Sequence, residues 1–296
     1  MSSLVPVLKI LSPVLYLLVF IAALTVLVIF SRMAVRKDLN RLLAAGLTAV
    51  FVLLLLAGWW FVTKGATVES RVLPPLILPS PAEVLHAFPR LHWEQGVVLS
   101  AFVSFKRVTI GFSLAALAAV VLGVYMASYK PIAAFFKPLE VASAYIPIIV
   151  FIPLTLAWWG SGEVQKIGFL FIACFVALLP LIIKSISDVK EAYLDVAKTK
   201  GASQWQLVRH VLFPVALPDI WDHLRVVYAV GWGWIILAEV VNAQKGLGYL
   251  MSVAERRSHT EFIFAIIIII VAIAVLCDMA WKYGGLLLFP YRRRSR

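Results

Sequence analysis

The sequence predicts an all-α protein that crosses a membrane several times, and three observations lead to that fold class. The 296-residue chain is 62% hydrophobic and only 14% charged. Its apolar residues come in continuous runs, which excludes an ordinary soluble domain. One polar, helix-prone stretch near residues 191–210 is stranded between such runs and cannot lie in hydrocarbon. We therefore expect a polytopic transmembrane helical bundle of about seven helices.

Seven apolar runs approach the length of about 20 residues that a helix needs to cross a bilayer. They lie near residues 13–30, 42–61, 108–128, 141–159, 167–183, 226–241 and 262–288. The fourth and fifth runs contain Pro147, Pro153 and Pro180. Proline inside a membrane helix marks a kink whose freed carbonyl must find a partner within the bundle.

The distribution of basic residues predicts which side of the membrane each loop occupies. When the polar stretch around Asp195 is placed in the cytoplasm, 17 of the 27 Lys and Arg residues lie inside. This is the asymmetry that the positive-inside rule requires. It predicts an external N-terminus and a cytoplasmic C-terminus. The net charge of +12 then indicates contact with anionic lipids, above all through residues 291–296, and not with nucleic acid.

The first run is predicted to be retained as a membrane anchor. Apart from Lys9 no basic residue precedes it, and no convincing small-residue cleavage site follows before Arg32. The chain then divides into four parts. They are an extra N-terminal transmembrane helix with a basic cytoplasmic loop (1–41), a transmembrane helix with an external Pro-rich segment (42–107), the main transmembrane domain with its cytoplasmic loop 184–222 (108–290), and a basic cytoplasmic tail (291–296).

The polar stretch 191–218 is the most informative part of the chain. It contains Asp195 in a helix-prone segment, Gly201 six residues later, and Pro214 and Pro218 at its end. This pattern predicts a helix, a tight turn at Gly201, and a second helix stopped by the two prolines. Such an element, projecting from the membrane, is a docking surface. A surface helix-turn-helix without a partner is the alternative.

The spacing resembles the cytoplasmic loop of permease subunits in bacterial binding-protein-dependent ABC importers. The family pattern is Glu-Ala-Ala, three residues, Gly, nine residues, then Ile-x-Leu-Pro. Residues 195–197 (Asp-Val-Ala) fill the first slot and residues 211–214 (Val-Leu-Phe-Pro) the last, whereas Glu191 and Ala192 lie one turn out of register. The resemblance begins weakly near residue 42, strengthens at 78–84, and is most specific over 160–250.

The resemblance implies a type I ABC importer permease fold and a coupling helix that inserts into a cleft of a separate ATPase. The coupling residues that it implies are Asp195, Ala197, Gly201, Ala202, Ser203, Gln206, Leu207, Pro214 and Pro218. It also implies a second copy of the chain, or a paralogous permease, to complete the pathway. The other partners would be ABC ATPase subunits that bind ATP and Mg, and a periplasmic or lipid-anchored solute-binding protein.

The expected location is the bacterial inner membrane, with transport as the function. The resemblance is strongest to permeases for nitrate, sulfonates including taurine, and bicarbonate, which suggests a small anion. The same branch includes importers of vitamin precursors, so the substrate stays open. Two other classes are an ion-gradient-driven carrier, which the scarcity of midplane carboxylates disfavours, and a membrane scaffold that recruits an ATPase without transport. Export is disfavoured because this loop belongs to importers.

The chain is not expected to be an enzyme or to hold a cofactor itself. An ATPase needs a Gly-rich phosphate loop ending in Gly-Lys, and no Gly-Lys dipeptide occurs. The five histidines show no metal-ligand spacing. Cys174 and Cys277 fall in predicted spans and are expected to be packing thiols. Energy must therefore come from another subunit.

Polar and aromatic residues inside the predicted spans are candidates for the solute pathway, because a buried ion in lipid is costly. Glu239 could line the pathway or be satisfied by neighbouring donors. Asp278 and Lys282, spaced i and i+4, are expected to pair locally. Aromatic residues near kinks can gate a cavity or simply pack. The pathway candidates are Tyr145, Pro147, Thr155, Trp158, Trp232 and Glu239.

Two external segments complete the prediction. Residues 63–107 should form an extended stretch followed by a short amphipathic helix from Pro81, with Ser80 as N-cap and Glu83 in the first turn. This segment could touch a binding protein or lie on the bilayer. Residues 242–260 contain a Gly-Leu-Gly-Tyr-Leu stretch (246–250), whose glycines allow close backbone approach and whose Tyr249 and Leu250 could anchor in the interface.

Overall fold

A computed structural model describes residues 40–65 and 67–291 of the chain. Within these residues every regular element is helical and no strand occurs. The chain divides into two compact units, with the division after Leu85. The second unit, which begins at His86, carries the predicted cytoplasmic loop and all the candidate pathway residues.

The first unit contains helix α2 (Arg41–Thr63), a short 3₁₀ turn η1 (Val68–Ser70) and the start of α3 (Pro81–Trp93). The predicted cap of α3 is confirmed: Ser80 Oγ accepts the backbone N–H of Glu83 at 3.3 Å, and the Glu83 carboxylate accepts the N–H of Ser80 at 2.7 Å. Arg71 forms an ion pair with Glu83 at 2.9 Å. The extended stretch before α3 is thereby fixed to the first turn of the helix.

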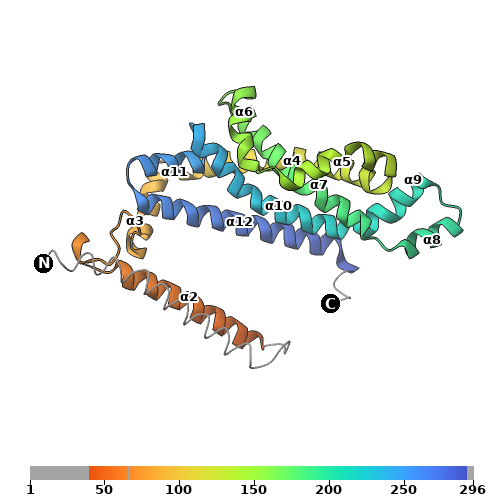
Figure 1. Cartoon of the computed structure of the whole chain (residues 1–296). Helices are drawn as coiled ribbons and strands as arrows, with labels where there is room; N and C mark the ends of the chain where they lie inside the picture. The colour runs from red at the N-terminus through yellow and green to blue at the C-terminus, as the bar shows by residue number, and fades with distance from the viewer. Residues whose placement is uncertain (1–39, 66, 292–296) are drawn as a thin grey trace. The chain divides into compact units, whose positions relative to one another are not determined.

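The second unit is a bundle of long helices with shorter helices at its ends (Figure 1). In chain order these are α4 (Val97–Ser128), α5 (Lys130–Tyr145), η2 (Ile148–Val150), α6 (Phe151–Trp159), α7 (Glu163–Ser187), α8 (Glu191–Thr199), α9 (Gln204–Leu207), η3 (Val208–Leu212), α10 (Phe213–Asn242), α11 (Leu247–Arg256) and α12 (Thr260–Leu288). Helix α7 packs against α4 and α10, and α10 also contacts α11 and α12.

Five helices in the described part of the chain are long and apolar enough to cross a membrane, or six if one bent pair counts as a span. Each of the predicted runs 42–61, 108–128, 167–183, 226–241 and 262–288 lies within one of the five, which are longer than predicted. The predicted first run, 13–30, lies outside the described residues.

The predicted span over residues 141–159, expected to be kinked by its prolines, is instead broken into two helical stretches. Helix α5 ends at Tyr145, and the helical stretch Ile148–Trp159 follows at a bend of 98°. The cause is Pro147, because the residue before a proline is driven out of the helical region. Ile146 accordingly has extended backbone, with φ −76° and ψ 122°. Proline here breaks the helix and does not merely kink it.

Helices α4 and α7 pack closely because α4 presents small residues at every fourth position. Gly111, Ala115, Ala119 and Gly123 are all buried. A Cβ added at Gly123 would come within 2.7 Å of Ile182 on α7. Small residues at this spacing let two membrane helices approach and gain van der Waals contact, which is the main attraction available to helices in lipid.

Polar contacts fix α10 to α12. Arg225 donates two hydrogen bonds to Asp278, at 2.5 and 2.6 Å, and Trp221 Nε1 donates to the carbonyl of Trp281 at 3.0 Å. The expected pairing of Asp278 with Lys282 is therefore wrong, because the hydrogen-bond partner of this carboxylate is Arg225 on the facing helix. A bidentate guanidinium from a facing helix fits both carboxylate oxygens, which a lysine one turn away on the same helix cannot do.

The prolines at the end of the predicted loop do not stop the second helix. Residues 208–212 form a π-helical turn, in which the N–H of Phe213 bonds to the carbonyl of Val208, and α10 continues through Pro214 and Pro218. Proline is tolerated in the first turn of a helix, where Pro214 stands. The π turn, which is one residue wider than an α turn, lets α10 begin anew at Phe213 while the chain stays helical.

Candidate functional site

The predicted docking loop forms one end of the second unit. Figure 1 shows α8 and α9 together at one end of the bundle and α11 at the opposite end. The predicted cytoplasmic loop and the predicted external segment 242–260 therefore lie at opposite ends, as their assignment to opposite sides of a membrane requires. The two short helices are joined by a turn over residues 200–203.

The turn at Gly201 is built by backbone hydrogen bonds that only a left-handed residue allows. Gly201 has φ +79°. Its N–H bonds to the carbonyl of Lys198 at 2.8 Å, and the N–H of Ala202 bonds to the carbonyl of Ala197 at 3.1 Å. This pair of bonds is the Schellman motif, in which a residue of positive φ just past the helix end satisfies the last carbonyls. The predicted tight turn is confirmed, and its geometry explains the glycine.

A capping box starts the second short helix. Ser203 Oγ accepts the N–H of Gln206 at 3.4 Å, and Gln206 Oε1 accepts the N–H of Ser203 at 2.8 Å. Each side chain satisfies a backbone donor that the helix start leaves free. Leu207 is buried against the bundle, at 4% exposure. The loop is thus fixed at both sides of Gly201, although its outer surface faces away from the chain.

Apolar side chains stand on that outer surface. Tyr193, Val196 and Trp205 have exposed fractions of 52%, 60% and 50%. Asp195 is also exposed and lies 3.4 Å from Lys198. Val196 belongs to the Asp-Val-Ala slot of the predicted motif, whereas Tyr193 and Trp205 were not among the predicted coupling residues. Aromatic side chains in an otherwise polar loop were the available signal. Large apolar groups outside the apolar helices typically mark a surface that a partner covers.

The candidate pathway residues of the bent segment separate into exposed and buried groups. Tyr145 ends α5 with 81% of its surface exposed, and Trp158 on α6 is 57% exposed. Pro147 stands in the break between them. Thr155 is fully buried: it donates to the carbonyl of Ile152 and accepts from Gln165 Nε2 at 3.1 Å. The structure therefore places Thr155 between α6 and α7.

The other two candidates are buried within the bundle. Trp232 is 1% exposed, and its ring nitrogen has no hydrogen-bond partner in the part of the chain that the structure describes. Glu239 is fully buried and pairs with Arg107 at 2.7 Å, while Arg107 also forms a two-bonded pair with Glu163 at the start of α7. Ser104 Oγ donates to Glu239. Arg107 and Ser104 were missed, because the sequence gives no sign of which helix faces Glu239.

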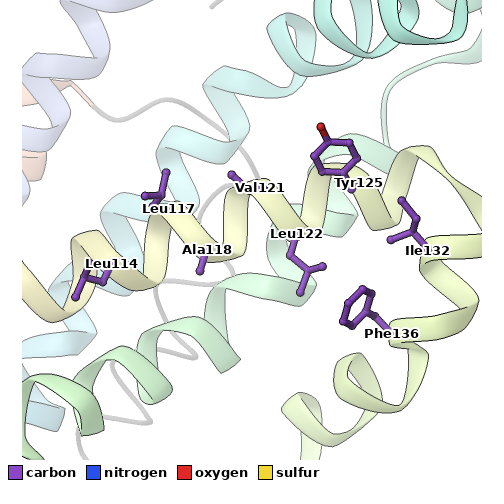
Figure 2. Close-up of a pocket in the computed structure, with 8 residues that line it drawn as sticks. All are labelled: Leu114, Leu117, Ala118, Val121, Leu122, Tyr125, Ile132 and Phe136. Atoms are coloured by element: carbon purple, nitrogen blue, oxygen red, sulfur yellow. The ribbon is translucent and has the colours of Figure 1, made fainter.

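A groove of about 570 Å³ lies between α4 and α5 and contains none of the candidate pathway residues. Figure 2 shows apolar side chains of α4, among them Leu117 and Leu122, with Ile132 and Phe136 of α5 lining it. Tyr125 supplies the hydroxyl group at its rim (Figure 2). The groove has no charged group with which to bind a polar solute.

Among the residues that the structure describes, no group of three His, Cys, Asp or Glu side chains could hold a metal ion. A comparison with protein families matches residues 119–282 to the binding-protein-dependent transport system inner membrane component. This chain belongs to that family. The matched region runs from α4 through both loop helices into α12.

Individual relatives agree with the family. The taurine transport system permease protein TauC of Escherichia coli K12 is 28% identical over 256 residues, covering 85% of this chain and 90% of its own. The riboflavin transport system permease protein RibX of Chloroflexus aurantiacus is 30% identical, covering 82% and 88%. The chain is thus an ABC importer permease subunit and a multi-pass protein of the inner membrane.

A solved structure supports the fold independently of sequence. The MetNI methionine ABC transporter, in an inward-facing conformation, aligns with a TM-score of 0.57 and 17% identity, covering 64% of this chain and 94% of the matched chain. At this identity the likeness shows the fold alone. The predicted all-α, type I importer permease bundle is confirmed.

Proposed function

We propose that this permease forms, as a homodimer, the membrane pathway of an ATP-driven importer for a small anion of the taurine or sulfonate class. Its loop 191–218 couples the pathway to a separate ATPase that binds ATP and Mg, and a periplasmic or lipid-anchored binding protein delivers the solute. The N-terminus is external and the C-terminus cytoplasmic, with residues 291–296 facing anionic lipids. Alternating access moves the helices between inward-facing and outward-facing states.

The observation that carries the proposal is the exposed apolar surface of the loop. Tyr193 and Val196 are spaced i and i+3, so they share one face of α8, and Trp205 stands on α9 after the turn. Aromatic residues are enriched at the centres of protein interfaces, where burial of large side chains provides most of the binding energy. An ATPase cleft would cover this surface. Asp195, Lys198 and the capped turn would give the contact its rim and its shape.

The pathway is proposed to run along the bent segment. Tyr145 stands directly before the break at Pro147, Trp158 stands near the end of the helical stretch that follows it, and both side chains are exposed. Aromatic rings can offer their positive edges to an anion. A break in a membrane helix is tolerated where its backbone lines a cavity or is covered by protein. A second copy of the chain would close this surface into a pathway.

The substrate class rests on relatives. TauC is named as a taurine transport permease, and a relative in Bacillus subtilis is named for aliphatic sulfonates. RibX is named for riboflavin, a larger solute, so a vitamin is the second candidate. The two solutes differ in ionic groups and in aromatic surface, since taurine carries a sulfonate and an ammonium group and no ring, whereas riboflavin is uncharged and has a large aromatic ring system. A direct competition assay distinguishes them.

The test is uptake by the intact complex. Tagged chain is purified from mild detergent with the subunits that accompany it, the associated ATPase and binding protein are identified by mass spectrometry, and the complex is reconstituted in vesicles. We expect uptake of radiolabelled taurine that requires ATP and is reduced by excess unlabelled sulfonate. Uptake driven by an ion gradient without ATP would establish a secondary carrier instead, and competition by riboflavin alone would reject the anion class.

A further inference from the structure

Glu239 of α10 stands at the point where four helices meet, and its carboxylate accepts hydrogen bonds from two of them, α4 and α11. Oε1 accepts from Arg107 Nη1 at 2.7 Å and from Ser104 Oγ at 2.8 Å. Oε2 accepts from Ser104 Oγ at 2.9 Å and from the backbone N–H of Gly248 at 2.9 Å. The fourth helix, α7, joins through Glu163, which pairs with the same arginine. A charge so buried is stable only when it is paired and hydrogen-bonded, and this one is.

The contact with Gly248 makes Glu239 a cap for α11 from outside that helix. Helix α11 begins at Leu247, so Gly248 is its second residue. The N–H of Leu247 bonds to Ser104 Oγ at 2.9 Å. A helix start leaves four backbone N–H groups without a partner inside the helix. Two of these groups in α11 therefore donate to side chains of α4 and α10. A negative charge at a helix N-terminus is further stabilised by the helix dipole.

The glycines next to this carboxylate are required by its position. A Cβ at Gly246 would lie 2.5 Å from the Glu239 carboxylate carbon, and one at Gly248 would lie 2.6 Å from the Glu239 Cβ. Both distances are shorter than any real contact of a Cβ atom. The backbone of α11 thus approaches Glu239 as closely as the chain permits. The two glycines that the sequence analysis interpreted as points of close approach are those that contact Glu239.

Arg107 extends the same cluster to the connection before α11. Its Nη1 donates to the carbonyl of Lys245 at 2.7 Å, and its other nitrogens pair with Glu163. Arg107 is 3% exposed, whereas the side chain of Glu163 is 62% exposed. The pair with Glu163 is therefore the contact of this cluster that water can reach. The buried contacts hold α4, α10 and α11 together, and the exposed contact joins them to the start of α7.

We propose that Glu239 is a positioning residue: its carboxylate, paired with Arg107, holds the N-terminus of α11 on α4 and α10, so that the ends of these three helices move as one body during transport. Glu239 then acts through α11 and does not touch the solute. Replacement by Gln would turn an NH₂ group toward either Arg107 or Gly248, both of which are donors, and would remove the negative charge. The α11 helix should consequently open more often.

The test measures the opening of α11 in the complete complex in membranes. Ser252 on α11 is 6% exposed, so Ser252→Cys, in a background with Cys174→Ala and Cys277→Ala, reports opening by its rate of reaction with a membrane-impermeant maleimide. We expect Glu239→Gln to raise that rate about tenfold or more, since a buried charged group loses its hydrogen bonds. Ser104→Ala should raise the rate less. The matched control is Glu255→Gln, which removes an exposed carboxylate from α11 itself and should change nothing.

Transport provides the second readout, and only this part depends on the proposed function. Glu239→Gln should lower the maximal rate of taurine uptake and leave the half-saturating concentration unchanged, and Glu239→Asp should recover part of the rate. Unchanged labelling in both Glu239→Gln and Ser104→Ala would overturn the inference, as would a shift in half-saturation at constant maximal rate. If Glu239→Gln fails to accumulate, the labelling of Ser104→Ala decides. Absence of taurine uptake in the parent chain would reject the substrate class while leaving the labelling result intact.

Discussion

The turn at Gly201 allows a substitution whose cost comes from the backbone alone. Gly201 has φ +79°, and a Cβ built there meets no atom within 4 Å. The Cβ of a substituted residue therefore overlaps no other part of the chain. Gly201→Val forces a β-branched residue into the left-handed region, which costs an L-residue about 1–2 kcal/mol. That cost lowers the population of the correct turn by a factor of roughly 5–30.

The expected result is loss of coupling with normal membrane insertion. The two Schellman bonds, from Gly201 to Lys198 and from Ala202 to Ala197, fix the angle between α8 and α9. With the turn distorted, Trp205 and Val196 would no longer be presented together. We expect ATP-dependent uptake by the vesicle-reconstituted complex to fall about tenfold, with the same amount of chain in the membrane. Gly201→Asn should retain most of the activity, because Asn is the residue that next most often occupies this position.

The matched control uses another glycine with the same backbone conformation. Gly96, before α4, has φ +60° and also has no atom within 4 Å of an added Cβ. Gly96→Val imposes a similar backbone cost away from the loop and should leave the ratio of ATP hydrolysed to solute transported unchanged. Normal uptake by Gly201→Val would refute the reasoning. Equal loss in Gly96→Val would show that the effect is general destabilisation and not coupling.

Three further predictions concern packing, ion pairing and pH. Gly123→Leu should lower the thermal unfolding midpoint of the purified complex, because its Cβ would come within 2.7 Å of Ile182 and overpacking costs about 1–3 kcal/mol; Gly58→Leu, where no atom lies within 4 Å, should not. Asp278→Asn should lower the same midpoint, because it removes the carboxylate that accepts two hydrogen bonds from Arg225, whereas Lys282→Ala should leave the midpoint unchanged. A larger effect of Lys282→Ala would show that Lys282 is the main partner of Asp278. The hydrogen bond from Arg71 holds the pKa of Glu83 below its ordinary value of 4.5. A carboxylate whose pKa is lower in the folded than in the unfolded state stabilises the fold at neutral pH, and this stabilisation is lost as pH falls through the folded pKa. The protection of the amides of residues 70–84, corrected for the intrinsic pH dependence of hydrogen exchange, should therefore fall over that pH range in the parent chain but not in Glu83→Gln.

The sequence predicted the parts of this molecule that depend on local pattern. Apolar runs gave five of the spans, and the position of Ser80 before Pro81 and Glu83 gave the start of α3. Gly201 gave the turn. The positions at which helices end were harder to predict, because a proline can end one helix and stand in the first turn of another. Pro147 ends α5, whereas Pro214 begins α10 after a π turn that no sequence pattern announced.

Partners across helices could not be predicted from the sequence. Asp278 has Lys282 at the favourable i+4 position, yet it pairs with Arg225, 53 residues away in the chain. Glu239 was recognised as an intramembrane carboxylate, but the rotation of α4 that brings Arg107 and Ser104 to it depends on the packing of the α4 small residues on α7. Long-range pairing of this kind is set by helix rotation and register, which local periodicity does not fix.

The most direct test of the proposed coupling is photo-crosslinking from the loop surface. A benzophenone amino acid replaces Trp205 in the tagged full-length chain, and the matched control replaces Trp158, which is similarly exposed. After irradiation in intact cells, mass spectrometry identifies the captured subunit. We predict capture from position 205, and not from 158, of a protein with a Gly-rich phosphate loop ending in Gly-Lys. Capture of no such ATPase from position 205, with ATP-independent uptake by the same chain in vesicles, would contradict the assignment of residues 191–218 as the coupling loop.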